Sequence, residues 1–155
     1  MEKENISIDL TIGQKKFDTS KMSDWTEEVW RAWIGEPEGY KGFTFDLLDD
    51  EALHFKVALI YYNEANNHMY VVFDIHNKSG QDISLEAGKW QVDETAFDAP
   101  NMLPVHLAAG EVKSGIEGDV PYMFMQNTLY LEFKVYEALT KRPVRELAFD
   151  VKVYL

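Results

Sequence analysis

The sequence predicts an all-β protein, an antiparallel sandwich of two sheets with one short α-helix near the N-terminus. Two patterns favour this fold class. Apolar and polar residues alternate in roughly nine short runs, as expected of half-buried strands. Turn residues separate these runs at short intervals. The 155 residues are 46% hydrophobic and 14% aromatic. That content is sufficient for a two-layer core, and we expect a single domain over residues 1–155.

The charge and the missing cysteines exclude several classes of function. The chain has 27 acidic and 15 basic residues, a net charge of −12, and no cysteine. A chain this acidic repels phosphate backbones and anionic membrane surfaces, so we expect no nucleic-acid partner. Without cysteine there is no disulfide scaffold, no thiolate zinc site and no cysteine nucleophile.

The lengths and positions of the apolar runs indicate whether the chain could insert into a membrane or be exported. No stretch approaches the ~20 apolar residues of a membrane span. Residues 1–5 contain no apolar run and do not resemble a signal peptide. We therefore expect a protein that does not insert into membranes. Its location would be the cytoplasm, or the cell surface or exterior if a leader has been removed.

The N-terminal third holds a predicted first strand and the predicted helix. Residues 6–12 alternate and predict the strand, and Lys15–Thr19 is a candidate edge piece. The helix is predicted at 23–34, with Ser23 or Asp24 as its cap and Gly35 and Pro37 after its end. Large aromatic side chains of this region form a candidate binding surface: Trp25, Trp30, Trp33 and Tyr40.

Two interpretations of these aromatic residues stay open. The helix could cover one open end of the sandwich and bury its tryptophans there, since tryptophan contributes much core area. Alternatively, the aromatic side chains could be exposed for sugar stacking or for docking of a partner.

A predicted strand at 43–47 contains Asp46 and is followed by Asp49, Asp50 and Glu51, so four carboxylates are clustered here. Carboxylates of this kind could hold calcium, which prefers several oxygen ligands. The spacing does not fit an EF-hand loop, so an exposed acidic turn is the favoured interpretation.

Residues 53–62 and 68–76 predict a hairpin around the loop Asn63–Asn67. A tight loop places His54 opposite His76 on the outward face of this hairpin. Two histidines are too few for a zinc site without a third ligand, and we predict no metal site.

The strand beginning at His68 continues through the turn Asn77–Gly80 into the alternating residues Ile83–Leu85. Asn and Gly are typical of turns, so this stretch predicts an antiparallel pair of strands. Ala87, Gly88 and Lys89 then predict a break before a separate strand that starts at Trp90.

The second half of the chain predicts further strands. A short strand at 103–107 is followed by a turn at 109–111 and by a glycine-punctuated edge strand at 112–118. Strong alternation at 129–136 and 147–155 predicts a C-terminal hairpin.

These segments carry a family resemblance. The run Tyr70–Leu85 resembles the strand–Asn–turn–strand core of bacterial immunoglobulin-like accessory domains of surface proteins and lipoproteins. In that pattern an aromatic-led segment follows, here Trp90–Val92, then a Gly–Glu turn, here within Leu107–Gly115, and a strand such as Leu129–Tyr136. The resemblance covers roughly residues 53–155. It implies an immunoglobulin-like fold and a non-catalytic binding role. The chain also resembles small intracellular proteinase inhibitors of bacilli. No segment of it matches their reactive loop, so no inhibitory residues are assigned here.

Catalytic motifs are absent from the sequence. It has no Gly-x-Ser-x-Gly elbow, no phosphate-binding glycine loop and no dinucleotide fingerprint. We therefore expect no enzyme and no cofactor. The leading hypothesis is an immunoglobulin-like binding or scaffolding module of a bacterial envelope. The alternatives are a cytoplasmic protein–protein regulator or proteinase inhibitor, and a carbohydrate-binding module that uses the tryptophans, Trp90 included.

Overall fold

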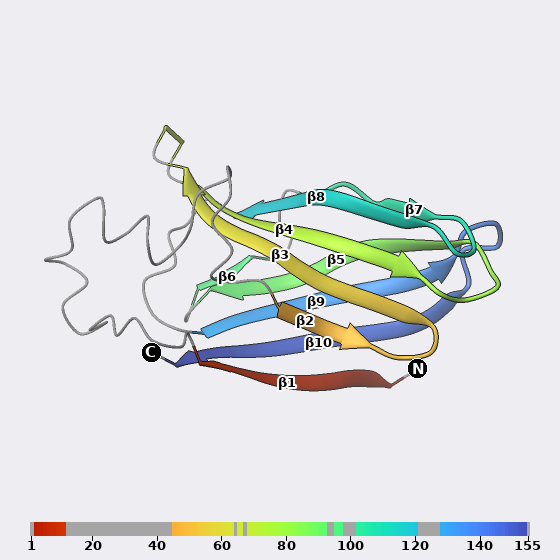
Figure 1. Ribbon diagram of the computed structural model, residues 1–155, viewed down its shortest axis with the longest axis horizontal. Coiled ribbons are helices and arrows are strands. Elements are labelled where there is room, and N and C mark those ends of the chain that lie inside the picture. The colour runs from red at the N-terminus through yellow and green to blue at the C-terminus, as the bar shows by residue number, and fades with distance from the viewer. Residues whose placement is uncertain are drawn as a thin grey trace, which may run out of the picture.

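The computed structural model describes residues 2–11, 45–63, 65–66, 68–92, 95–97, 102–120 and 128–154. In this part of the chain every regular element is a strand, arranged in two sheets (Figure 1). The prediction of an all-β, two-sheet protein is confirmed. The predicted helix at 23–34 and the candidate edge piece at 15–19 lie outside the described residues. No helix long and apolar enough to cross a membrane occurs among the residues that the structure describes.

The first sheet has the strand order β1-β10-β9-β5-β6, and β7 pairs with β5 beside this path. Its strands are β1 (Lys3–Thr11), β5 (Ile83–Val92), β6 (Thr95–Phe97), β7 (Val105–Leu107), β9 (Thr128–Glu137) and β10 (Pro143–Tyr154). All pairs are antiparallel except β1 with β10. A parallel pair needs a long connection, and these two strands stand far apart in the chain.

The second sheet has the order β2-β3-β4-β8 and is antiparallel throughout. Its strands are β2 (Phe45–Asp49), β3 (Leu53–Asn63), β4 (His68–Asn77) and β8 (Val112–Val120). Three predictions are confirmed in it. β3 and β4 form the expected hairpin, His54 lies opposite His76, and β8 is an edge strand.

The predicted pairing of residues 68–77 with residues 83–85 is wrong. β4 belongs to the second sheet and β5 to the first, so the turn between them crosses from one layer to the other. Asn77 stabilises this crossing with its side chain. Its buried side chain donates to the carbonyl oxygens of Gln81, Leu107 and Ala108, and its oxygen accepts hydrogen bonds from Ser79.

The predicted break at Ala87–Lys89 is also wrong. β5 continues through these residues, and its register against β9 shifts between Ala87 and Trp90. Such a β-bulge inserts extra residues without ending the strand. A Cβ on Gly88 would lie 3.1 Å from Cβ of Glu132, so the bulge also brings the two backbones close. Polar and small residues inside a strand therefore marked a bulge.

The core between the sheets is centred on five aromatic side chains. Phe55 and Phe73 come from the second sheet, and Trp90, Phe133 and Phe149 come from the first. All are at most 1% exposed. The rings of Phe55 and Phe133 are 4.7 Å apart, and Trp90 meets Phe73 and Phe133 edge-on at 6.0 and 5.8 Å. Such edge contacts add stability beyond the area buried.

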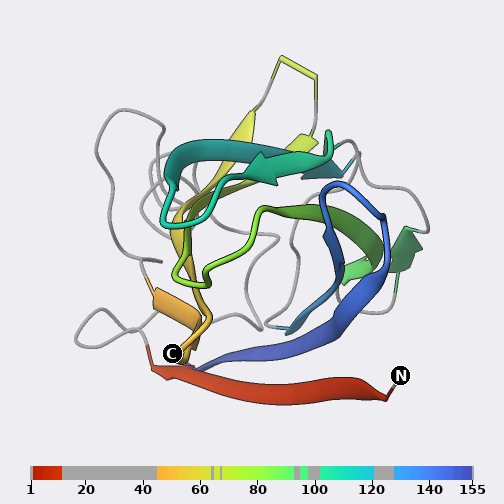
Figure 2. The same ribbon diagram turned by 90° about the vertical axis from the view of Figure 1, so that its right-hand side faces the viewer.

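The turns β2–β3, β4–β5, β7–β8 and β9–β10 lie together at one end of the sandwich, the end that faces the viewer in Figure 2. Backbone hydrogen bonds link them: the amide of Lys78 donates to Ala52, and that of Ala138 donates to Asp82. The Asp82 carboxylate accepts a hydrogen bond from the amide of Ala109. Because the turns hold one another, this end of the molecule fixes the spacing of the two sheets.

Candidate functional site

A groove lies where the edge strand β8 of the second sheet meets β7 and the segment before it in the first. We call this concavity the edge groove. Its volume is about 460 Å³. It is lined by apolar and charged side chains together: Tyr70, Leu103, Pro104, Val105, His106, Lys113, Ile116, Glu117 and Asp119. Leu103 is part of this lining, and 80% of its surface is exposed.

The turn between β7 and β8 sets the geometry of the groove. Gly110 has a φ of 78°, a conformation that glycine adopts without steric cost. The amide of Glu111 donates to Ala108, and the carboxylate of Glu111 accepts from the amide of Ala108. The side-chain amide of Asn77 also donates a hydrogen bond to the carbonyl oxygen of Ala108. The two strands that flank the groove are therefore fixed at their common end.

A hydrogen bond between a buried carboxylate and a partly exposed imidazole lies at one wall of the edge groove. Asp119 is 5% exposed, and its Oδ2 lies 2.5 Å from Nδ1 of His68 on the neighbouring strand β4. Burying a carboxylate without a partner is costly, and the imidazole supplies that partner. Next to it, Asn66 donates to the hydroxyl of Tyr70 at 2.7 Å and accepts from the amide of His68 at 3.1 Å. These contacts hold the Tyr70 ring at the groove.

A second concavity of about 370 Å³ lies on the other side of Pro104 and His106. It is lined by Ser84, Glu86, Pro104, His106, Tyr136, Ala138 and Lys141. Ser84 is the register partner of both His106 on β7 and Tyr136 on β9, so these three residues form one row across the sheet. Pro104 and His106 therefore line both hollows.

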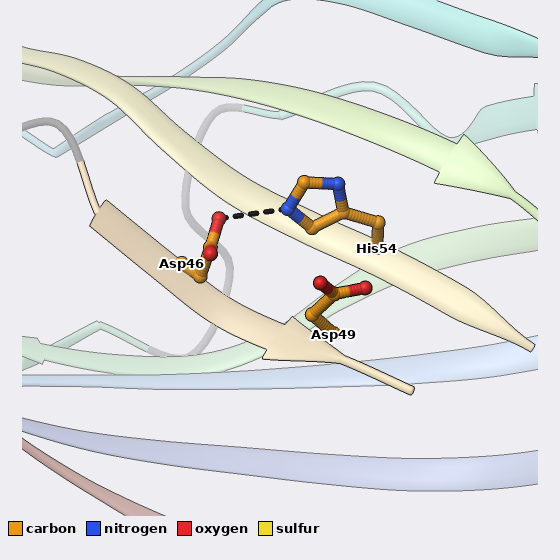
Figure 3. A group of neighbouring side chains, drawn as sticks. All are labelled: Asp46, Asp49 and His54. Carbon is orange, nitrogen blue, oxygen red and sulfur yellow. Dashed lines mark hydrogen bonds and ion pairs between the residues drawn. The ribbon is translucent and has the colours of Figure 1, made fainter. Parts of the chain in front are cut away.

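The acidic cluster predicted near residue 46 is present and exposed on the outer face of the second sheet. Figure 3 shows the side chains of Asp46 and Asp49 from β2 beside His54 from β3. One potential ligand atom from each lies within 4.8 Å of the others, and Nε2 of His54 is 2.7 Å from Oδ1 of Asp46. His76, the other histidine of the predicted facing pair, is not a member of this cluster.

Asp49 already has a cation as its partner. Nζ of Lys78 lies 2.5 Å from its Oδ1. The hydrogen bond from Lys78 is the main cause of the lowered pKa of Asp49. Because an ammonium group holds this carboxylate and water reaches all three side chains, the arrangement is accounted for as a surface hydrogen-bonded cluster.

The aromatic site residues predicted from sequence, Trp25, Trp30, Trp33 and Tyr40, lie outside the described residues. The fourth tryptophan is described, and its predicted contribution to sugar binding is wrong. Trp90 is 0% exposed and packs in the core. A buried indole offers no face on which a sugar could stack.

Sequence reasoning missed the edge groove entirely. Its walls come from segments on either side of the β7–β8 turn and from Tyr70, which is far away in the chain. One signal was available: Leu103 is followed by a proline and precedes a short strand, so a large apolar residue stands outside the alternating pattern. The alternation of apolar and polar residues predicts strands, but it does not indicate which sheet edges lie next to each other in the fold.

Comparisons with known proteins give little further information. No family model matches the chain, and no curated protein matches it. Among solved structures, the chain is similar to the ASH/PapD-like domain of human CEP192, PapD-like domain 7, with a TM-score of 0.37 and 6% identity. The match covers 66% of this chain and 85% of that one. A likeness at this level assigns neither fold nor function.

Proposed function

We propose that this chain is a non-enzymatic, immunoglobulin-like binding module that engages a protein partner at the edge groove. The observation that carries the proposal is the groove itself. It is concave, it mixes apolar with charged side chains, and strands of both sheets build it. Protein interfaces combine an apolar centre with polar surroundings in this way. The centre here would be Leu103 and Ile116, with Lys113 and Glu117 beside them.

The strand order supports the immunoglobulin-like part of the proposal. In that fold strand B pairs with E in one sheet, while C, F and G are neighbours in the other. In this chain β4 pairs with β8, and β5, β9 and β10 are neighbours in that order. In the proposed fold, β4, β5, β8, β9 and β10 would correspond to strands B, C, E, F and G.

The core supports the same correspondence. Immunoglobulin domains of antibodies carry a buried tryptophan on strand C that packs on a disulfide between strands B and F. Here Trp90 on β5 contacts Phe73 on β4 and Phe133 on β9, and these two rings lie 5.6 Å apart. A pair of phenylalanines would take the place of the disulfide in this cysteine-free chain.

Selection of peptides against the whole protein tests the proposal. A phage-displayed peptide library would be panned on the wild type, and enriched peptides would be tested by fluorescence polarisation. Leu103→Asp places a charge at the apolar centre of the groove and should weaken binding at least about tenfold, as loss of an interface anchor does. Leu139→Asp is the matched control, because Leu139 is 93% exposed but lies in the β9–β10 turn.

Two results would contradict the proposal. One is enrichment of peptides that bind wild type and Leu103→Asp equally well. The other is no enrichment above a protein-free panning control.

The setting in a bacterial envelope belongs to the proposal as well. It is supported by the resemblance of residues 53–155 to domains of bacterial surface proteins and lipoproteins. A lipobox upstream in the native reading frame would support it. A complete reading frame without one would favour the cytoplasmic regulator instead.

A further inference from the structure

β1 is a long edge strand without the interruptions that the other edges carry. Its register against β10 runs without a shift over nine residue pairs, from Lys3 to Thr11. By contrast β2 is five residues long and has a register shift, and β8 has a shift near Gly115, whose φ is 72°. Short length and bulges are the usual protection of a sheet edge against pairing with another chain.

The other side of β1 has no partner strand among the residues that the structure describes. Both views place this strand at the margin of the molecule (Figures 1 and 2). Ile6 and Ile8 point toward the core and are only partly buried there. Within the described part of the chain, the strand therefore presents an unpaired backbone edge together with apolar side chains that a neighbouring strand would cover further.

The sequence of β1 is complementary to itself in one antiparallel register. Centring the pairing on Ile6 places Lys3 of each copy opposite Asp9 of the other, and Asn5 opposite Ser7. Lys3, Asn5, Ser7 and Asp9 share the outer face, because side chains alternate along a strand. Opposite charges directly across a strand pair stabilise it, and like charges destabilise it. Pairing centred on Ser7 would instead place Asn5 opposite Asp9.

We propose that β1 is a self-association edge, on which a second copy of this chain pairs antiparallel through its own β1. The two first sheets then join into one continuous sheet around a twofold axis at Ile6. Lys3 already lies 3.1 Å from Glu132 of its own chain. Its side chain is 41% exposed, which leaves it able to reach an aspartate across the new pair.

A charge exchange tests this inference and is independent of the groove. In a symmetric dimer, Lys3→Asp places two carboxylates opposite each other, and Asp9→Lys places two ammonium groups opposite each other. Each variant alone should associate at least about tenfold more weakly than wild type. An equal mixture of the two restores both opposite-charge pairs and should form a heterodimer. Sedimentation equilibrium over a wide concentration range measures each case.

Two controls separate pairing from other effects. Glu132→Gln removes the intramolecular partner of Lys3 and should leave the dimer in place. Asp150→Lys changes an exposed charge on β10, one strand inside the edge, and should change the dissociation constant less than about twofold. Circular dichroism confirms that each variant is folded. Wild type that stays monomeric at the highest concentration overturns the proposal, and so does a mixture that associates no better than its separate components.

Discussion

Asn77 is buried where the chain passes from the second sheet to the first, and its amide meets five hydrogen-bonding groups. Its nitrogen must donate, because all three of its neighbours are carbonyl oxygens. A hydrogen bond adds only modestly to the stability of a fold, but a buried polar group that has lost its partner costs the full free energy of its desolvation. One residue therefore joins the β4–β5 crossing to the β7–β8 turn.

Replacing this amide by an acid should be strongly destabilising. Asn77→Asp keeps the shape but sets an acceptor against three carbonyl oxygens, and we expect a loss of about 3 kcal/mol in the free energy of unfolding. Urea denaturation followed by circular dichroism measures it. Gln81→Glu makes the same change at an exposed position of the same turn and should cost less than about 0.5 kcal/mol. Equal losses in the two variants would contradict this role of Asn77.

Gly118 is a position at which a larger side chain does not fit. A Cβ at this position would lie 2.2 Å from Cη2 of Trp90. The ring itself is locked among buried aromatic side chains, so it cannot move aside without disturbing the core. We expect Gly118→Ala to lower the free energy of unfolding by about 3 kcal/mol.

A double-mutant cycle checks the reason for this loss. Trp90→Phe removes both the clashing ring atoms and an indole N–H that has no acceptor among the described residues. It should therefore cost less in the Gly118→Ala background than in wild type. Gly80→Ala is the matched control, because its Cβ would have nothing within 4 Å. Additive effects of the two core substitutions would contradict the clash.

At the scale of elements, Arg145 joins three parts of the sandwich. From β10 it donates two hydrogen bonds of 2.8 Å to Glu4 of β1, and its Nη2 lies 2.9 Å from Asp50 in the β2–β3 turn. The hydrogen bond from Arg145 lowers the pKa of Glu4, although partial burial opposes it. Burial also acts to raise the pKa of Asp50, and hydrogen bonds from Ala52, Arg145 and Leu53 outweigh it.

These lowered pKa values predict how the contribution of Arg145 depends on pH. Stability from a carboxylate with a lowered pKa is present above the pKa of the unfolded chain, and is lost as the pH falls through the folded value. The ordinary values are 4.5 for Glu and 3.8 for Asp. Arg145→Met should cost about 1 kcal/mol near pH 7, a modest figure because these groups are partly exposed.

Thermal unfolding of wild type and Arg145→Met from pH 7 to pH 2 measures this difference. It should be constant above about pH 5 and shrink as both carboxylates become protonated. Arg142→Met is a suitable control, since Arg142 is largely exposed and pairs with Glu137 inside one turn. A difference that persists unchanged at pH 2 would mean that Arg145 acts by packing alone.

The strands could be predicted from sequence because alternation is a local property. Leu129, Leu131, Phe133 and Val135 alternate, and all four are buried on β9. Pairing is not local. The turn after Asn77 has the composition of a hairpin turn, and its role in crossing between sheets depends on carbonyl groups about 30 residues away.

The same limit explains the break predicted before Trp90 and the missed groove. Gly88 and Lys89 interrupt the alternation, but a bulge and a strand end look alike until the neighbouring strand is known. The edge groove needs two edges that meet across the sandwich, and no segment of the chain contains both. The opposition of His54 and His76 was predictable because a single hairpin loop fixes it.

At the scale of the whole molecule, the fixed turns at one end and the aromatic core hold the two sheets at a constant separation. The edge groove is formed by strands of this frame together with the segment before β7, and β8 is paired with β4 on both sides of its register shift. A binding surface on paired strands keeps its shape without a ligand, which reduces the entropy lost on binding. We therefore expect a partner to meet a preformed groove.

Mapping of a bound ligand by NMR tests this central claim most directly. The whole protein, labelled with ¹⁵N, would be titrated with the peptide that binds most tightly after selection. The account predicts that the largest amide shifts cluster at Leu103, Lys113, Ile116 and Glu117, and that the shifts vanish in Leu103→Asp. Shifts that centre instead on the turn end, around Ser79 and Lys141, would contradict the edge groove as the binding surface.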